Sequence, residues 1–137
     1  MAVLEDVLVV ALEQAVAAPY CSRLLAENGA RVIKLERPEG DFSRAYDTVV
    51  NGESAYFTWL NSGKESLSVD IKNLSDLELI KRIILKADVF IQNLRPGATE
   101  KLGLDYASLV HTNDQIIVCN ISGYGQTGTY AKMKAYD

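Results

Sequence analysis

The chain has 137 residues, a net charge of -4 and a pI near 5.0, a length that fits one compact domain with one core. Its 48% hydrophobic and 23% charged residues exclude a disordered chain, and the acidic balance excludes general attraction to nucleic acid or anionic membranes. Because the first apolar stretch, residues 7–12, is too short for a membrane span and lacks the basic flank of a signal peptide, we expect a cytoplasmic protein.

The first part of the chain has the pattern strand, helix, strand. The β-branched and aliphatic run at residues 7–12 is typical of a central parallel strand that is buried on both faces. Pro19 opens an apolar-periodic helix, and Gly29 follows where a left-handed C-terminal cap would lie. Residues 31–36 form the second strand. A polar loop over residues 37–52 follows, and loops of this length usually carry function or are disordered.

The alternation continues through the middle of the chain. Residues 66–71 alternate apolar and polar side chains as a half-buried strand does, and Asn73 or Ser75 can cap the helix that follows. Residues 89–91 form the fourth strand.

The last part of the chain adds two short helices and a fifth strand. A Pro-Gly turn at residues 93–97 precedes a short helix that ends near Gly103, and Asp105 can cap another helix. Residues 116–121 complete the strands. This order predicts an α/β fold with a doubly wound, mainly parallel, Rossmann-like sheet, whose ligands bind beyond the carboxyl ends of the strands.

Basic residues recur just after the predicted strands. Each alone is typical of a solvated surface charge, but together at the ligand-binding edge of an acidic protein they favour phosphate binding. They are Arg37, Lys72, Arg95, Lys101, Lys132 and Lys134.

Residues 123–128 match the pattern G-x-G-x-x-G. A dinucleotide fingerprint lies between the first strand and its helix, whereas this motif follows the last strand. A glycine-rich active-site loop is the better interpretation, and the misplacement disfavours a dinucleotide-dependent oxidoreductase.

Other chemistry-bearing residues indicate structural roles. The aromatic cluster at residues 54–61 is more typical of a core than of a nucleobase platform. Cys21 and Cys119 lack metal-type spacing and are expected to be reduced, buried thiols. The single histidine, His111, is expected to be a solvated or capping residue. No metal site is predicted.

The motifs, in their order along the chain, resemble family III CoA-transferases, the group that also includes carnitine-pathway transferases and α-methylacyl-CoA racemases. The resemblance covers nearly the whole chain. Its main segments are Ala18-Pro19-Tyr20-Cys21, residues 24–30 and 32–38, Gly40-Asp41, Ser54-Ala55-Tyr56-Phe57, Asn61, Lys64-Glu65-Ser66-Leu67, Asp70-Ile71-Lys72, residues 87–89, residues 93–97 and residues 122–128.

The resemblance implies coenzyme A as co-substrate, with no covalently bound cofactor. Near its phosphates it places Arg37, Lys72 and Lys101, and near the adenine Val69 and Ile71. Residues that line the coenzyme would be Asn93, Leu94 and Arg95, with Lys134, Tyr136 and Asp137 near the active site. The pantetheine arm would lie beside Ala15, Val16 and Ala17.

The resemblance also implies the reaction and the assembly. The family's nucleophile is an aspartate further along its chain than position 137, so residues 1–137 are expected to be a CoA-binding domain that stops before that aspartate and the second domain, and no catalytic residue is assigned. Acyl-CoA and a small, possibly dicarboxylic, acid would be the substrates, and the full-length enzyme would be an interlocked homodimer. We expect the isolated chain to be inactive and to aggregate or associate.

Two alternatives remain open within this interpretation. The chain can be a non-catalytic nucleotide-binding fragment that kept the fold and lost the chemistry. It can also be a racemase-like member of the family, although Tyr136 stands where the racemases carry a histidine, which argues against racemisation.

Overall fold

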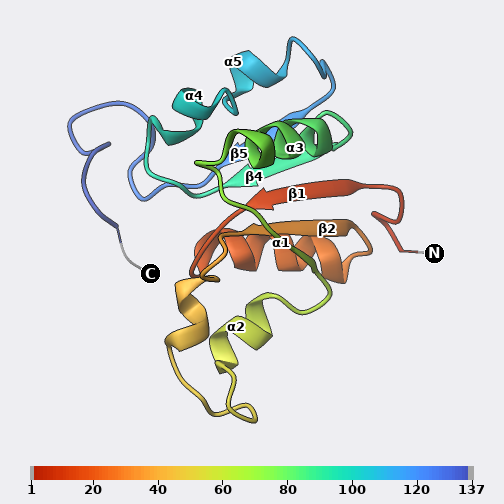
Figure 1. Ribbon diagram of the computed structural model, residues 1–137, viewed down its shortest axis with the longest axis vertical. Coiled ribbons are helices and arrows are strands. Elements are labelled where there is room, and N and C mark those ends of the chain that lie inside the picture. The colour runs from red at the N-terminus through yellow and green to blue at the C-terminus, as the bar shows by residue number, and fades with distance from the viewer. Residues whose placement is uncertain (1, 136–137) are drawn as a thin grey trace.

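The computed structural model describes residues 2–135 and contains one five-stranded sheet in which all paired strands are parallel. The strands are β1 (Leu8–Leu12), β2 (Arg31–Glu36), β3 (Glu65–Ser68), β4 (Val89–Gln92) and β5 (Ile117–Asn120). Helices cover both faces of the sheet (Figure 1). The predicted α/β fold with a doubly wound parallel sheet is confirmed.

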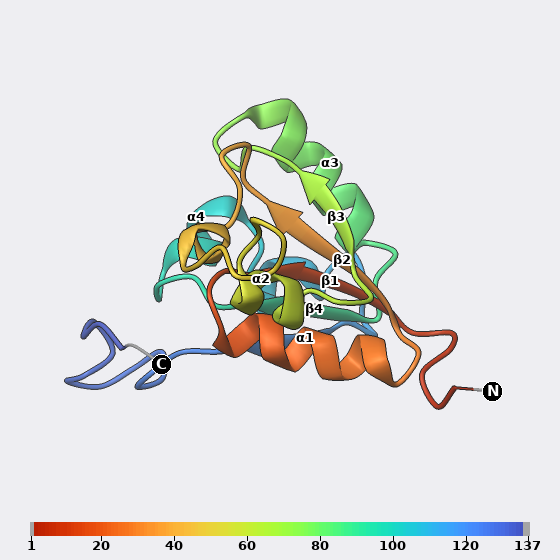
Figure 2. The same cartoon turned by 90° about the horizontal axis from the view of Figure 1, so that it is seen from below.

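The helices divide between the two faces of the sheet. Those in the structure are α1 (Ala17–Glu27), the 3-10 helix η1 (Phe42–Ala45), α2 (Ala55–Leu60), α3 (Leu74–Ile84), α4 (Ala98–Leu102) and α5 (Tyr106–Leu109). The helices α3, α4 and α5 lie on one face and α1 lies on the other (Figure 1). The helix α2 contacts α1 and η1. It lies further from the sheet than α1 does (Figure 1), and it overlaps α1 when the molecule is seen from below (Figure 2).

The strand order β3-β2-β1-β4-β5 sets the position of the site. After β1 the chain moves outward through β2 to β3, and then crosses back to place β4 on the other side of β1. The loops that leave β1 and β4 therefore diverge at a topological switch point, where open parallel sheets bind their ligands.

Neighbouring residues of the central strands enter separate cores. Val10 and Phe90 are fully buried in the core beneath α3, whereas Val9 and Ile91 belong to the core beneath α1. This alternation follows from the two-residue period of a strand. It confirms that the run at residues 7–12 is a strand buried on both faces, which the structure begins at Leu8.

Most predicted helix ends are confirmed by their caps. Asn73 caps α3 by accepting hydrogen bonds from the N–H groups of Ser75 and Asp76, and Asp105 caps α5. Gly103 ends α4 in the left-handed conformation, and Gly29 follows α1 with a φ of 102°.

Two expectations about local structure were wrong. The third strand was predicted over residues 66–71 but ends at Ser68. The N–H of Val69 donates the last backbone hydrogen bond to β2, at the carbonyl of Glu36. The side chain of Asp70 then accepts the N–H of Lys72, which turns the chain away. The aromatic segment forms α2, capped by Ser54, rather than a core element. Tyr56 and Trp59 are about half exposed, because α2 packs on helices outside the sheet.

The two cysteines are free thiols at the core beneath α1, and both are half-buried. Burial raises the pKa of the Cys21 thiol, and the neighbouring Cys119 adds to the effect. No helix in the described part of the chain has the length and apolar character needed to cross a bilayer.

Candidate functional site: two adjoining cavities at the switch point

The first cavity, of about 380 Å³, lies beyond the carboxyl ends of β1, β2 and β3. Val69 and Ile71 supply apolar wall, and Arg37 and Lys72 supply positive charge. The remaining lining consists of Leu12, Glu13, Gln14, Leu35, Glu36, Pro38, Glu39, Gly40, Asp41, Asp70 and Leu94.

The second cavity, of about 740 Å³, lies between the loop after β4 and the segment that follows β5. Its described lining contains four basic side chains and no acidic one. The basic residues are Arg95, Lys101, Lys132 and Lys134. The second cavity therefore favours an anionic ligand although the whole chain is acidic.

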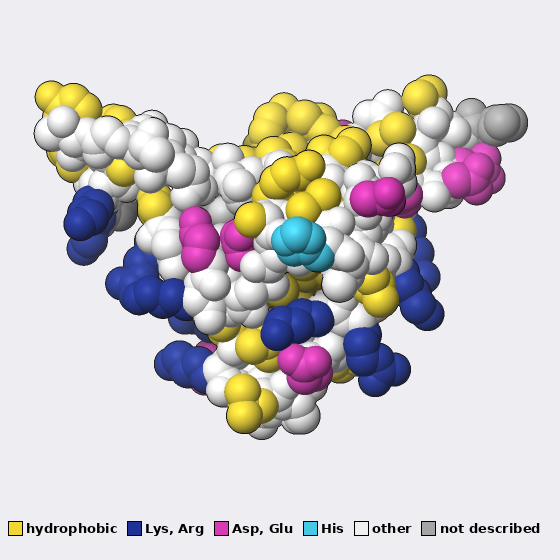
Figure 3. Space-filling view, turned by 90° about the horizontal axis from the view of Figure 1, so that it is seen from above, with side chains coloured by type: hydrophobic (Ala, Val, Ile, Leu, Met, Phe, Trp, Pro, Cys, Tyr) yellow, Lys and Arg dark blue, Asp and Glu magenta, His cyan; other side chains and the backbone are white. Residues whose placement is uncertain are grey.

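The two cavities adjoin, because Gln14 and Leu94 line both. The segment after β5 projects from the side of the molecule on which the strands end (Figure 1), and Lys and Arg side chains lie next to it (Figure 3). A long ligand with several phosphates could therefore contact both cavities at once.

The cations of the two cavities have no carboxylate partner within the described residues. The ion pairs found there use other basic side chains and none of the six that line the cavities. Arg37 donates from Nε to the carbonyl of Gly40 at 2.7 Å, which orients its side chain beside the loop. As far as residues 2–135 are concerned, the six charges remain available to an anion.

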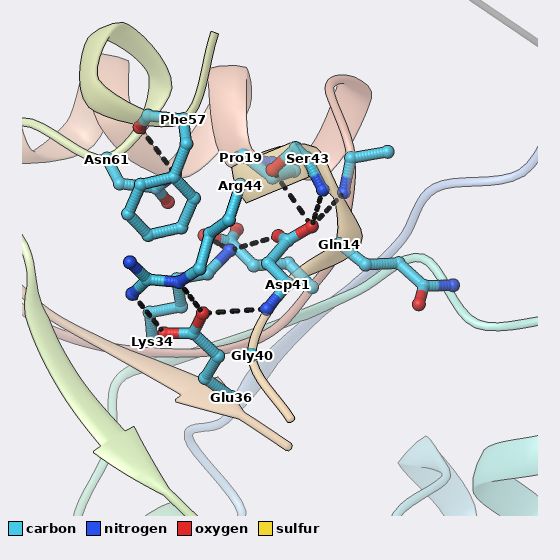
Figure 4. A network of polar contacts seen from close by, with 12 residues as sticks. Gln14, Pro19, Lys34, Glu36, Gly40, Asp41, Ser43, Arg44, Phe57 and Asn61 are labelled. Carbon is cyan, nitrogen blue, oxygen red and sulfur yellow. Dashed lines mark hydrogen bonds and ion pairs between the residues drawn. The ribbon is translucent and has the colours of Figure 1, made fainter. Parts of the chain in front are cut away.

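Two of the five carboxylates that border the first cavity, Glu13 and Asp41, pair with buried lysines. The Lys34 network is defined as Glu13, Lys34, Asp41 and Lys64. Figure 4 shows Lys34 and Asp41 of this network close to Ser43 of η1 and Phe57 of α2. Lys34 Nζ lies 2.9 Å from Asp41 Oδ2 and 3.6 Å from Glu13 Oε1. Lys64 Nζ lies 2.7 Å from the same Glu13 oxygen. Each of the four side chains is at most 2% exposed, so two positive and two negative charges balance out of water.

Burial and ion pairing shift the pKa values of Asp41 and Lys64 in opposite directions. Burial by itself raises the pKa of Asp41, but the hydrogen bond and charge of Lys34, with the N–H groups of Ser43 and Ala15, bring it below its ordinary value. Burial lowers the pKa of Lys64, and the charge of Glu13 opposes that shift. Asp41 is therefore a carboxylate at neutral pH.

A second pair, Glu36 and Arg44, ties η1 to β2. Glu36 accepts Arg44 Nε at 2.6 Å and Nη2 at 3.0 Å, the backbone N–H of Asp41 at 2.7 Å and the hydroxyl of Ser66 at 2.9 Å. Burial would raise the pKa of Glu36, but these donors lower it to about 2. Arg44 also lies over the ring of Phe57, 3.6 Å from its centroid.

The loop between β1 and α1 is held where the cavities meet. The side chain of Asn93 accepts the N–H of Gln14 at 3.0 Å and donates to its carbonyl at 2.8 Å. The next N–H, that of Ala15, donates to Asp41 Oδ1 at 3.2 Å. Two loops that leave neighbouring strands are thus joined at the switch point.

The chain matches the family model for CoA-transferase family III over residues 4–137. The chain belongs to this family. It is 38% identical to an acetyl-CoA:oxalate CoA-transferase of Acetobacter aceti, covering 97% of this chain and 34% of the relative. It is 39% identical to a succinate–glutarate CoA-transferase of Agrobacterium fabrum, covering 98% of this chain and 36% of the relative. The chain therefore spans about a third of the length of these relatives.

A solved structure has the same fold as this family III chain. The crystal structure of a CAIB/BAIF family protein from Brucella suis superposes with a TM-score of 0.93 at 40% identity, covering 99% of this chain and 37% of that one.

The structure gathers most of the predicted site residues of this family III chain at one edge of the sheet. Arg37, Val69, Ile71 and Lys72 line the first cavity. The second cavity is lined by Asn93, Leu94, Arg95, Lys101 and Lys134. Lys101 is thus separated from Arg37 and Lys72 by the boundary between the cavities, although the family resemblance implies that all three lie near the phosphates of CoA.

Other predicted residues lie elsewhere. Ala15, Val16 and Ala17 line neither cavity, because the loop turns away after Gln14. Tyr136 and Asp137 lie outside the described residues. His111 is exposed on the face that carries α3, α4 and α5 (Figure 3) and lines neither cavity.

The glycine-rich segment after β5 takes part in the second cavity through Gly123 and Tyr124. A Cβ at Gly123 would lie 2.1 Å from Cβ of Ala135, so the chain folds back closely on itself there. This segment follows an edge strand and precedes no helix within the described residues, which agrees with the interpretation that it is no dinucleotide fingerprint.

Sequence reasoning missed Gln14 and the Lys34 network. One signal for the network was present, because Lys34 interrupts an otherwise apolar strand and a buried lysine requires a counter-ion. The sequence did not show which of many carboxylates would supply it. Gln14 carries no comparable signal, since its importance comes from the meeting of two loops.

Proposed function

We propose that this chain supplies the coenzyme A-binding part of a CoA-transferase that moves CoA between an acyl-CoA and a small carboxylic acid. The observation that carries the proposal is the pair of adjoining cavities at the switch point, lined by cations without carboxylate partners among the described residues. Membership of CoA-transferase family III supports it.

The chemistry of the two cavities suggests how CoA would bind. Val69 and Ile71 offer an apolar wall for the adenine, with Arg37 and Lys72 beside it for phosphate. Arg95, Lys101 and Lys134 would hold further phosphate charge in the second cavity, next to Asn93 and Leu94. Arginine suits this role because its planar guanidinium can donate two parallel hydrogen bonds to one phosphate.

The proposed reaction divides the exchange into covalent steps. A carboxylate further along the family's chain attacks the acyl thioester, forming a mixed anhydride and releasing CoA thiolate. The thiolate then attacks the enzyme's carbonyl carbon, which frees the acyl group as a carboxylate and leaves an enzyme thioester. The acceptor acid attacks this thioester to form its own anhydride with the enzyme, and the returning thiolate completes the transfer. No residue of this chain is assigned the nucleophile's role.

The names of the relatives support a dicarboxylic acceptor, since they specify oxalate, succinate and glutarate. We propose an acceptor of this class, and a homodimer for the complete enzyme. A non-catalytic nucleotide-binding module would also bind CoA, so transfer between succinyl-CoA and a second dicarboxylate must be measured with the complete protein.

Isothermal titration calorimetry with CoA and with NAD tests the binding proposal. CoA should bind and NAD should not, and Arg37→Gln and Arg95→Gln should each weaken CoA binding about tenfold, as expected for one lost charge-assisted contact. Arg82→Gln is the matched control, because Arg82 is exposed on α3 and lines neither cavity. Equal binding of NAD, or an equal loss with Arg82→Gln, would contradict the proposal.

A further inference from the structure

The backbone of Ala15 has an unfavourable conformation at the junction of the two cavities. Its φ is +62°, in the left-handed region that a residue with a Cβ rarely adopts. The residue immediately before it, Gln14, lines both cavities. Other contacts must therefore hold the loop in this conformation.

Asp41 supplies the contact on one side of Ala15. Its Oδ1 accepts the N–H of Ala15 at 3.2 Å, together with the N–H of Ser43 at 3.0 Å and the Ser43 hydroxyl at 2.9 Å. Its other oxygen, Oδ2, is occupied by Lys34 Nζ at 2.9 Å. Protein donors thus occupy both oxygens of a side chain that is 1% exposed, although Asp41 borders the first cavity.

The carboxylate of Asp41 is itself held firmly. Lys34 comes from the middle of β2 and binds Oδ2, and Ser43 belongs to η1 and binds Oδ1, so two elements fix the position of the carboxylate. The side chains around Asp41 converge on it from these two elements, while the side chain of Gln14 points away from it (Figure 4). A rigid acceptor of this kind can select one backbone conformation in a loop that it faces.

We propose that Asp41 is a positioning residue, which holds Ala15 in its left-handed conformation and thereby, together with the two hydrogen bonds from Asn93, sets the place of Gln14 between the two cavities. Lys34 serves this role by fixing and neutralising the Asp41 carboxylate. The effect on ligand binding is indirect, through the loop. This inference rests on the proposed function only in taking CoA as the ligand.

Two matched double variants test the inference. Lys34→Met/Asp41→Asn removes one positive and one negative charge but leaves an amide oxygen that can accept the N–H of Ala15. Lys34→Met/Asp41→Leu makes the same change in charge with a side chain of similar size and no acceptor. In both, Glu13 keeps its partner Lys64, so neither variant leaves a buried charge unpaired.

Amide hydrogen exchange is the first readout and needs no ligand. The N–H of Ala15 should exchange about tenfold faster in the Leu variant than in the Asn variant, as expected when one hydrogen bond is lost. The N–H of Val10, in the fully buried centre of β1, should exchange alike in both and serves as the internal reference. Equal protection of Ala15 in the two variants would overturn the inference.

CoA affinity is the second readout. The Leu variant should bind CoA about tenfold more weakly than the Asn variant, because the two differ only in the acceptor for the N–H of Ala15. Equal affinities in the two variants would also overturn the inference. If the unaltered chain binds no CoA, the proposed function fails, and the exchange of Ala15 alone then decides whether Asp41 holds the loop.

A further variant covers the case in which both double variants fail to fold. Ala15→Gly removes the penalty at positive φ, so it should raise the melting temperature by roughly a few degrees if the loop is held left-handed. A lower melting temperature would show that Ala15 is not held in this conformation, and would overturn the inference.

Discussion

Lys34 shows how a charged side chain is accommodated in a central strand. Its stem lies among the packed residues of β2, and its ammonium group reaches two carboxylates, from the end of β1 and from the loop after β2. Moving these charges out of water costs free energy of solvation. The ion pairs among Lys34, Glu13, Asp41 and Lys64 offset this cost. The network stabilises a specific arrangement of loops and would be strongly destabilised by loss of a single member.

The low pKa of Glu36 predicts that the folded protein loses stability in acid. Its pKa falls from an ordinary 4.5 to about 2 on folding, so its contribution is complete above pH 4.5 and is lost as the pH falls toward 2. Glu36→Gln should flatten the decline in the free energy of unfolding across this window, measured by urea denaturation with fluorescence of the single Trp59.

Glu65→Gln is the control for Glu36. Glu65 also pairs with an arginine, Arg31, but both side chains are more than half exposed, where solvent screens the pair. Its substitution should change the acid profile much less. An equal effect of the two substitutions would contradict the role given to Glu36.

At the scale of elements, local signals set where most helices begin and end. Asn73 and Asp105 supply side-chain caps, and Gly103 supplies the left-handed residue that ends a helix. These features could be predicted because each cap depends on residues within a few positions of it. The end of the third strand and the exposure of the aromatic segment were mispredicted, because they depend on contacts with β2, η1 and α1.

The turn after α1 gives a prediction at this scale. Gly29 has a φ of +102°, and a Cβ there would lie 2.2 Å from Cβ of Ala2. Gly29→Ala should therefore destabilise the protein by more than the ~1 kcal/mol expected for a positive φ alone. Gly52→Ala is the matched control, because its φ is +89° and its Cβ would meet no atom within 4 Å. Equal losses in urea denaturation would rule out the close approach of residue 2.

At the scale of the whole molecule, the sheet separates two cores that share its central strands. Phe90 lies in the core beneath α3 and is fully buried, so Phe90→Ala should cost about 3–5 kcal/mol in the free energy of unfolding. Leu74→Ala, at a residue that is 79% exposed, should change it by less than about 0.5 kcal/mol. Thermal and urea denaturation of both variants check this contrast, and similar losses would contradict the position of the core.

The distribution of charge also belongs to this scale. The chain is acidic overall, yet the described lining of the second cavity carries four basic side chains and no acidic one. Net charge alone therefore says little about the ligand. The prediction that basic residues after the strands would gather at one edge is confirmed, because all strands of a parallel sheet end on the same side.

The amino-acid sequence by itself determined the alternation of strands and helices, the family, and the edge of the sheet at which the basic residues meet, since these follow from periodicity and from motifs that are local in the chain. Only the tertiary structure decided that β4 pairs with β1 on the side opposite β2. It also decided that the site is divided into two cavities meeting at Gln14, and that Lys34 pairs with Glu13 and Asp41. The physical reason is that strand order and buried pairing depend on contacts between residues distant in the chain, for which many partners are chemically equivalent until the fold brings one within reach.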